Sequence, residues 1–167
     1  MKYEIYRLAA LAAVAFTLSA CGQAPGDGGD AAIMDTPEYR AMVYRQSLMR
    51  VIGFKAGRVR GMADGNIPVD EAEFARSAGE LATLAGMIED GIVAGSDSDS
   101  ISASAALPAI WNDPGDFATR AANLRMAAET VASQAQAGGF QAAQVAASEN
   151  IGPACGGCHR TYRQSDD

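Results

Sequence analysis

The feature that most constrains this chain is the pentapeptide Cys155-Gly156-Gly157-Cys158-His159. C-x-x-C-H is the attachment pattern of a c-type haem. Two thiols three residues apart on a helical turn can each add to one vinyl group of a porphyrin, and the next imidazole then reaches the iron as an axial ligand. Gly156 and Gly157 present no side chain that would obstruct the ring. The spacing predicts one covalent haem c, attached through Cys155 and Cys158 and ligated by His159.

Two other uses of a C-x-x-C pair are weaker interpretations. A redox disulfide normally lies at the first helix of a thioredoxin-like βαβ unit, and this sequence has no such pattern. Zinc needs a fourth ligand beside two thiolates and one imidazole, and no second cluster of ligands follows. The single histidine of the chain stands where haem attachment requires it.

The remaining sequence indicates helices. Alanine is abundant while Val, Ile and Thr are scarce, which favours helices over a β-sandwich. Apolar residues recur at helical spacing in four segments. Those segments are Thr36 to about Met62, Pro68 to about Val93, Asp113 to about residue 137, and Phe140 to about Gln164 with an interruption near 152–153. Short turns between them predict an all-α antiparallel four-helix bundle over residues 35–167. The Ser/Asp/Gly-rich stretch 94–114 is a long loop, either functional or mobile.

The beginning of the sequence is typical of an export signal. Lys2 and Arg7 precede an apolar run that is too short to span a bilayer, and small residues then lead to Cys21. Leu18-Ser19-Ala20-Cys21 resembles the lipobox of bacterial lipoproteins, which predicts cleavage of residues 1–20 and lipidation of Cys21. The alternative is an ordinary secretory signal cleaved nearby. Residues 21–34 are glycine-rich and predict a flexible tether.

Export predicts a periplasmic location, either on a lipid anchor or as a soluble protein, and c-type haem is attached outside the bacterial cytoplasm. The formal net charge of -7 argues against a nucleic-acid-binding groove. An acidic surface instead favours redox partner proteins that carry a basic patch.

A C-x-x-C-H motif at the C-terminal end of a helical bundle resembles the cytochrome c′ / cytochrome c-556 family. The resemblance covers about residues 35 to 164. It depends on three segments: Tyr44 to Met49, Pro108 to Trp111 with Phe117, and Cys155 to Arg163. Members of this family often pair through their first two helices, so the resemblance is compatible with a homodimer.

The resemblance leaves the sixth iron ligand open. Cytochromes c′ close the distal side with an apolar side chain, so their iron is five-coordinate and meets NO or CO. Cytochromes c-556 place a methionine there and act as electron carriers. The arginine of the family corresponds to Arg45, and the distal position four residues later is Met49, with Met42 as the fallback ligand. We expect a one-electron carrier with His159/Met49 ligation; the alternative is a five-coordinate gas-binding protein in which Met49 only fills the core.

Four further residues are candidates for haem contacts. Arg45 is expected to pair with the haem propionates, although a solvated helix arginine is the alternative. Gln46 is its neighbour in the matching segment, and Trp111 is expected to seal the bundle near the haem edge. Arg163 lies four residues after His159 and either packs beside the imidazole or is exposed. No distal histidine or acid–base pair is evident, so we expect no enzymatic activity.

Overall fold

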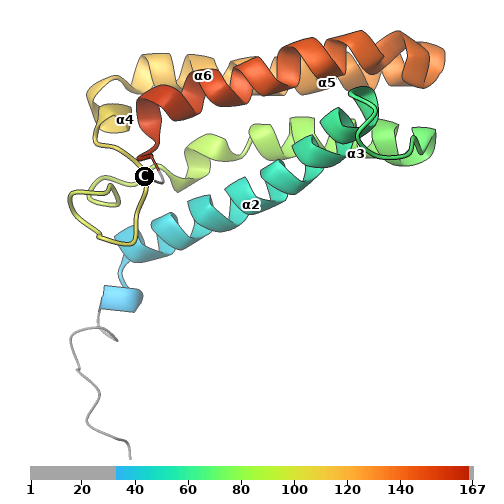
Figure 1. The fold of residues 1–167 in the computed structure, drawn as a ribbon. Coiled ribbons are helices and arrows are strands. Elements are labelled where there is room, and N and C mark those ends of the chain that lie inside the picture. Colours follow the sequence, from blue (N-terminus) through green and yellow to red (C-terminus); the bar gives the residue numbers. More distant parts are fainter. Residues whose placement is uncertain (1–32, 166–167) are drawn as a thin grey trace, which may run out of the picture.

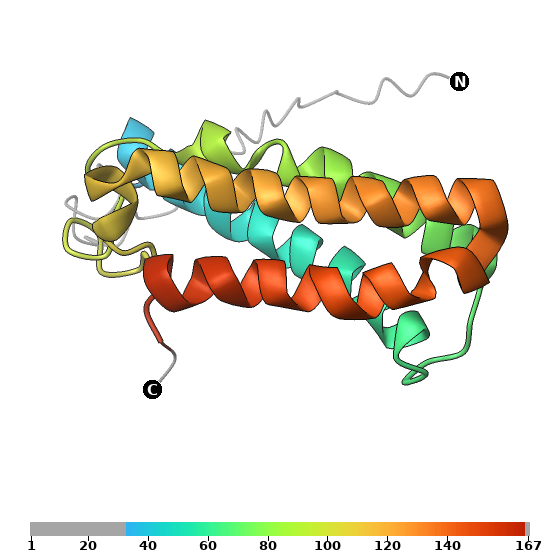
Figure 2. The same ribbon diagram turned by 90° about the horizontal axis from the view of Figure 1, so that it is seen from above.

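The computed structural model describes residues 33–165, and these form a bundle of long helices that run antiparallel to one another (Figures 1 and 2). The elements in order are α2 (Pro37–Ala63), α3 (Glu71–Ala85), η1 (Ile88–Gly91), α4 (Ala109–Asn112), α5 (Pro114–Ala146), η2 (Ala147–Ile151) and α6 (Gly152–Tyr162). The predicted all-α four-helix bundle is confirmed. The predicted signal peptide, Cys21 and most of the predicted tether lie outside the described residues.

Side-chain caps start the three long helices. Thr36, with Pro37 after it, accepts a hydrogen bond from the backbone N–H of Tyr39 at the start of α2. Asp70 caps α3 in the same way. Asp113 caps α5. These starts lie within about three residues of the predicted ones, because a capping oxygen is a local signal.

A sharp turn divides α5 before the fourth helix of the bundle begins. Gly139 has φ 72° and ψ -167°, a region of backbone space that is essentially restricted to glycine. The chain reverses there, and Figure 2 shows the two limbs lying side by side. The fourth helix therefore consists of the end of α5, the π-helical turn η2 and then α6. The break at Gly138-Gly139 is confirmed.

The second helix is shorter than the sequence predicts. α3 ends at Ala85 and not near Val93, and the 3₁₀ turn η1 follows. A Cβ at Gly91 would lie 2.7 Å from both Arg45 Cγ and Tyr44 Cδ1. The chain leaves the helix so that its backbone can pass against α2 at this glycine. The prediction was wrong because this constraint comes from another helix.

The loop after η1 is fastened on two sides. Gln46 Nε2 donates to the carbonyl of Ala103 at 2.7 Å, which ties the loop to α2. Ala106 forms an isolated antiparallel bridge with Arg163, and the backbone N–H of Gln164 donates to the carbonyl of Ala105 at 2.8 Å. Figure 1 shows this loop, α4 and the end of α6 together at one end of the bundle.

The bundle encloses one apolar core. Phe74 of α3 and Phe140 of the fourth helix meet edge to face with ring centroids 5.0 Å apart. The largest buried apolar side chains around them are Val59, Met62, Leu81, Val131 and Ile151. Among residues 33–165, no helix combines the length and the apolar character that crossing a membrane requires.

Candidate haem site

The two cysteines and the histidine of the motif lie on α6. Cys155 and Cys158 are half-buried and unpaired, and His159 is exposed. Burial raises the pKa of both thiols, while the nearby guanidinium groups of Arg60 and Arg120 partly oppose that change for Cys155 and Cys158 respectively. Both sulfurs are therefore held as thiols at neutral pH.

Two adjoining cavities lie along these three residues. One has a volume of about 400 Å³ and the other of about 270 Å³. The residues that line both are Met49, Ile88, Cys158 and His159. Together the cavities form a trough between α2, α5 and α6, with the loop at one end. We call this the trough below.

Met49 is the methionine that the structure places in the trough. It lies on α2, is half-buried and lines both cavities together with His159. Met42, the fallback ligand, is 2% exposed and lines neither cavity. Of these two side chains, only Met49 is positioned to face a group bound to His159.

Arg45 also lines the trough, but its guanidinium is engaged by the loop. Nη1 donates to the carbonyl of Gly91 and to Ser96 Oγ, both at 2.7 Å. Nη2 donates to the carbonyl of Ser96 at 2.5 Å and to Ser104 Oγ at 3.2 Å. The side chain is 8% exposed and holds the loop against α2. The expected pairing with a haem propionate stays a prediction.

The other predicted contact residues divide between the trough and its surroundings. Gln46 and Arg163 line the larger cavity. Trp111 lines neither cavity; it packs against the core, and the Arg45 guanidinium carbon lies 5.7 Å from its ring centroid. Its indole N–H is buried without a hydrogen-bond partner. The structure thus brings Arg45, Gln46 and Arg163 together with the motif and places Trp111 behind Arg45.

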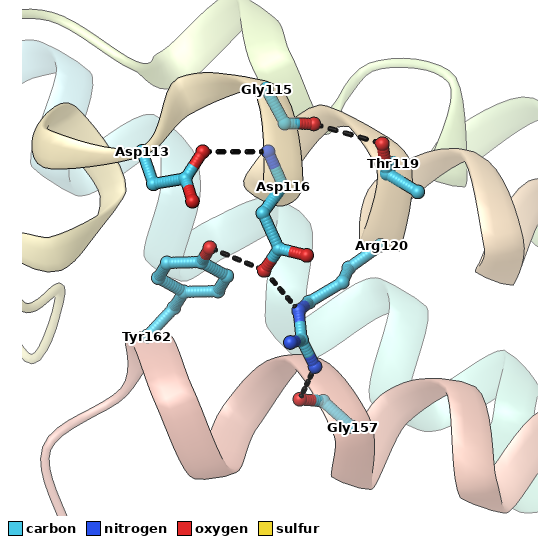
Figure 3. Close-up of polar contacts among 7 residues, drawn as sticks. All are labelled: Asp113, Gly115, Asp116, Thr119, Arg120, Gly157 and Tyr162. Atoms are coloured by element: carbon cyan, nitrogen blue, oxygen red, sulfur yellow. Dashed lines mark hydrogen bonds and ion pairs between the residues drawn. The ribbon is translucent and has the colours of Figure 1, made fainter.

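A polar network that we did not predict lies between α5 and α6 (Figure 3). Asp116 Oδ2 accepts from Tyr162 Oη and from Arg120 Nε, both at 2.6 Å. Arg120 Nη1 donates to the carbonyl of Gly157 at 2.6 Å. The hydrogen bond to Asp116 raises the pKa of Tyr162 to about 12. The i,i+4 spacing of Asp116 and Arg120 was a visible signal for their ion pair.

The residues of the trough fit a covalent haem c. Two thiols on successive turns of α6 and one imidazole are the donor set of a c-type haem. Gly156 and Gly157 between the cysteines have no side chains. The remaining wall is mainly apolar, and this suits a porphyrin whose faces are apolar. The apolar wall residues are Ile52, Ala56, Ile88, Ile110, Phe117, Ala121 and Leu124.

Comparison with known proteins gives the same result. A family model described as Cytochrome C′ matches residues 40–163. Cytochrome c-554 of Cereibacter sphaeroides is 37% identical over 123 residues, which cover 73% of this chain and 79% of that protein. Cytochrome c-556 of Agrobacterium tumefaciens is 34% identical over 119 residues, covering 71% and 93% respectively.

Solved structures match across the whole bundle. Cytochrome c prime from Shewanella frigidimarina superposes with a TM-score of 0.70 at 30% identity, covering 78% of this chain and 98% of that one. A nitric oxide complex of a cytochrome c prime variant from Alcaligenes xylosoxidans has a TM-score of 0.66 at 25% identity, with coverages of 78% and 98%. The chain belongs to the cytochrome c′ family and carries one covalently bound haem c.

Proposed function

We propose that this protein is a one-electron carrier whose haem iron takes His159 and Met49 as its two axial ligands. The observation that carries the proposal is that Met49 of α2 and His159 of α6 line the same two cavities. A thioether is a soft ligand suited to haem iron, and His/Met ligation raises the reduction potential. The bound haem supplies a one-electron couple between ferric and ferrous iron.

The protein supplies attachment, orientation and shielding. Cys155 and Cys158 hold the ring on α6. The rigid packing of α2 fixes the sulfur of Met49, because Leu48 and Ile52 on either side of it are buried in the core. A sixth ligand fixed in this way leaves no site for an exogenous ligand. These features support electron transfer with little rearrangement.

Substitution at Met49 tests the ligand. The wild-type protein should show a low-spin ferrous spectrum that CO does not change. Met49→Leu keeps the volume and removes the sulfur, so it should give a high-spin iron that binds CO. Met42→Leu is the matched control, because Met42 lies one to two turns earlier on the same helix and lines neither cavity. A wild-type spectrum that survives Met49→Leu would show that the assignment of the sixth ligand is wrong.

The comparisons favour a second candidate, a five-coordinate protein that binds a small gas. One matched structure is a nitric oxide complex, and another is a carbon monoxide complex of a cytochrome c prime variant from the same organism. Support for methionine ligation comes only from the residues of this chain. If the wild-type ferrous protein is high-spin and takes up CO readily, gas binding is the function and Met49 is a wall residue.

We further propose that the mature protein is anchored on the periplasmic side of a membrane by a lipid on Cys21. The support is the Leu-Ser-Ala-Cys sequence at residues 18–21. Cys21→Ser should move the haem protein from the membrane fraction to the soluble fraction. An unmodified wild-type protein that is already soluble would favour the ordinary secretory signal.

A further inference from the structure

An ion pair on α5 lies against the haem-attachment motif. Arg120 lines the smaller cavity together with Cys155, Cys158 and His159. Its Nη1 donates to the carbonyl of Gly157, which lies between the two cysteines, at 2.6 Å. The guanidinium is thus hydrogen-bonded to the backbone of the segment that carries the haem.

Asp116 holds that guanidinium in place. Its Oδ2 accepts from Arg120 Nε and from Tyr162 Oη, each at 2.6 Å (Figure 3). Tyr162 is 4% exposed and packs edge to face on Phe117, with ring centroids 5.3 Å apart. The carboxylate is anchored by a buried side chain, so neither member of the pair is a freely moving surface charge.

We propose that Arg120 and Asp116 set the reduction potential of the haem, with Asp116 as the residue that positions Arg120 on the carbonyl of Gly157. A fixed positive charge beside a haem favours the reduced state, because oxidation adds one positive charge to the iron. A fixed negative charge favours the oxidised state. Paired as they are, the two charges largely cancel. The inference requires the covalent haem of the family and is independent of the sixth ligand.

The two single substitutions are expected to act with opposite signs. Arg120→Gln leaves the Asp116 carboxylate uncompensated, so the midpoint potential falls. Asp116→Asn leaves the Arg120 cation uncompensated, so the potential rises. Each change should alter the equilibrium constant for electron exchange with a fixed mediator about threefold, since both side chains are partly open to water. Their side chains are 33% exposed for Arg120 and 39% exposed for Asp116.

Three further variants of the holoprotein sharpen the test. The double variant Arg120→Gln/Asp116→Asn removes both charges, so its potential should return close to that of the wild type. Arg120→Lys keeps the charge and should restore most of the potential lost in Arg120→Gln. The control is Arg125 with Glu129, an i,i+4 pair on the same helix that lines neither cavity of the trough. Arg125→Gln and Glu129→Gln should leave the potential unchanged.

Two additional readouts separate tuning from mere structural support. The free energy of unfolding should fall in both single variants, because each loses the ion pair, while the potentials move in opposite directions. Raising the ionic strength should shrink both shifts in potential. Potentials that move in the same direction, or that do not move in a variant with an intact haem spectrum, would overturn the proposal without affecting the assignment of the haem.

Discussion

The two walls of the trough each carry an arginine, and the two are held in different ways. Arg45 on the α2 wall is 8% exposed and donates to backbone carbonyls and serine hydroxyls of the loop. Arg120 on the α5 wall is one-third exposed and pairs with the carboxylate of Asp116. One cation fastens a loop and the other lies against the haem-attachment motif.

The pKa shifts of the two guanidinium groups follow this difference. Burial lowers the pKa of Arg45, and the Asp97 carboxylate only partly opposes this. The hydrogen bond to Asp116 raises the pKa of Arg120. A buried cation without an ion-pair partner depends on complete hydrogen bonding, whereas a half-exposed ion pair also retains water. Damage to the α2 wall should therefore cost more stability than damage to the α5 wall.

The largest effect is expected at Arg45. Arg45→Met keeps the aliphatic volume but leaves the carbonyls and hydroxyls of the loop without their donor. We expect the free energy of unfolding to fall by about 3 kcal/mol, measured by urea denaturation of the holoprotein. Arg125→Met, at an exposed site on α5, is the control and should change the free energy of unfolding very little. Equal losses at the two sites would remove the basis for the comparison.

A smaller effect is expected at Gly91, which tests the same wall from the loop side. A Cβ there would lie 2.7 Å from Arg45 Cγ and from Tyr44 Cδ1. Gly91→Ala should therefore push the loop away from α2 and reduce the free energy of unfolding by about 1 to 2 kcal/mol. Gly53→Ala on α2 meets no atom within 4 Å and serves as the control. A neutral Gly91→Ala would show that the loop shifts freely, and the loop would then not be fastened as we describe.

The smallest effect concerns the α5 wall in acid. Hydrogen bonds from Tyr162 and Arg120 lower the pKa of Asp116 in the folded protein. A carboxyl group with a lowered pKa stabilises the fold above its unfolded pKa of about 4, and this contribution is lost as the pH falls through the folded value. Asp116→Asn should therefore make unfolding less sensitive to pH below about 5. Identical pH profiles for wild type and variant would show that the pair contributes nothing to stability.

The sequence predicted the elements whose causes are local. Capping oxygens at Thr36, Asp70 and Asp113 and the left-handed turn at Gly139 depend on neighbouring residues, so their positions could be located in advance. The end of α3 at Ala85 could not, because the loop must pass close to α2 at Gly91. That constraint belongs to a pair of elements distant in sequence.

The candidate site divides in the same way. The motif on α6 names its own chemistry, and counting along α2 from Arg45 placed Met49 in the trough. The loop partners of Arg45 are mostly backbone carbonyls and serines, which have no distinctive pattern. The contact of Arg120 with the carbonyl of Gly157 depends on how α5 packs on α6, so the sequence showed at most an i,i+4 ion pair.

The π-helical turn η2 determines which way the haem-binding side chains point. Pro153 has no N–H to donate, and in a regular helix its ring would clash with the carbonyl four residues earlier, at Glu149; the wider turn Ala147–Ile151 relieves this. Such a turn accommodates one extra residue, equivalent to a rotation of about 100° in a regular helix. Deleting one residue between 147 and 151 would swing both sulfurs and the imidazole around the helix axis, so the protein would be translated in full yet remain colourless.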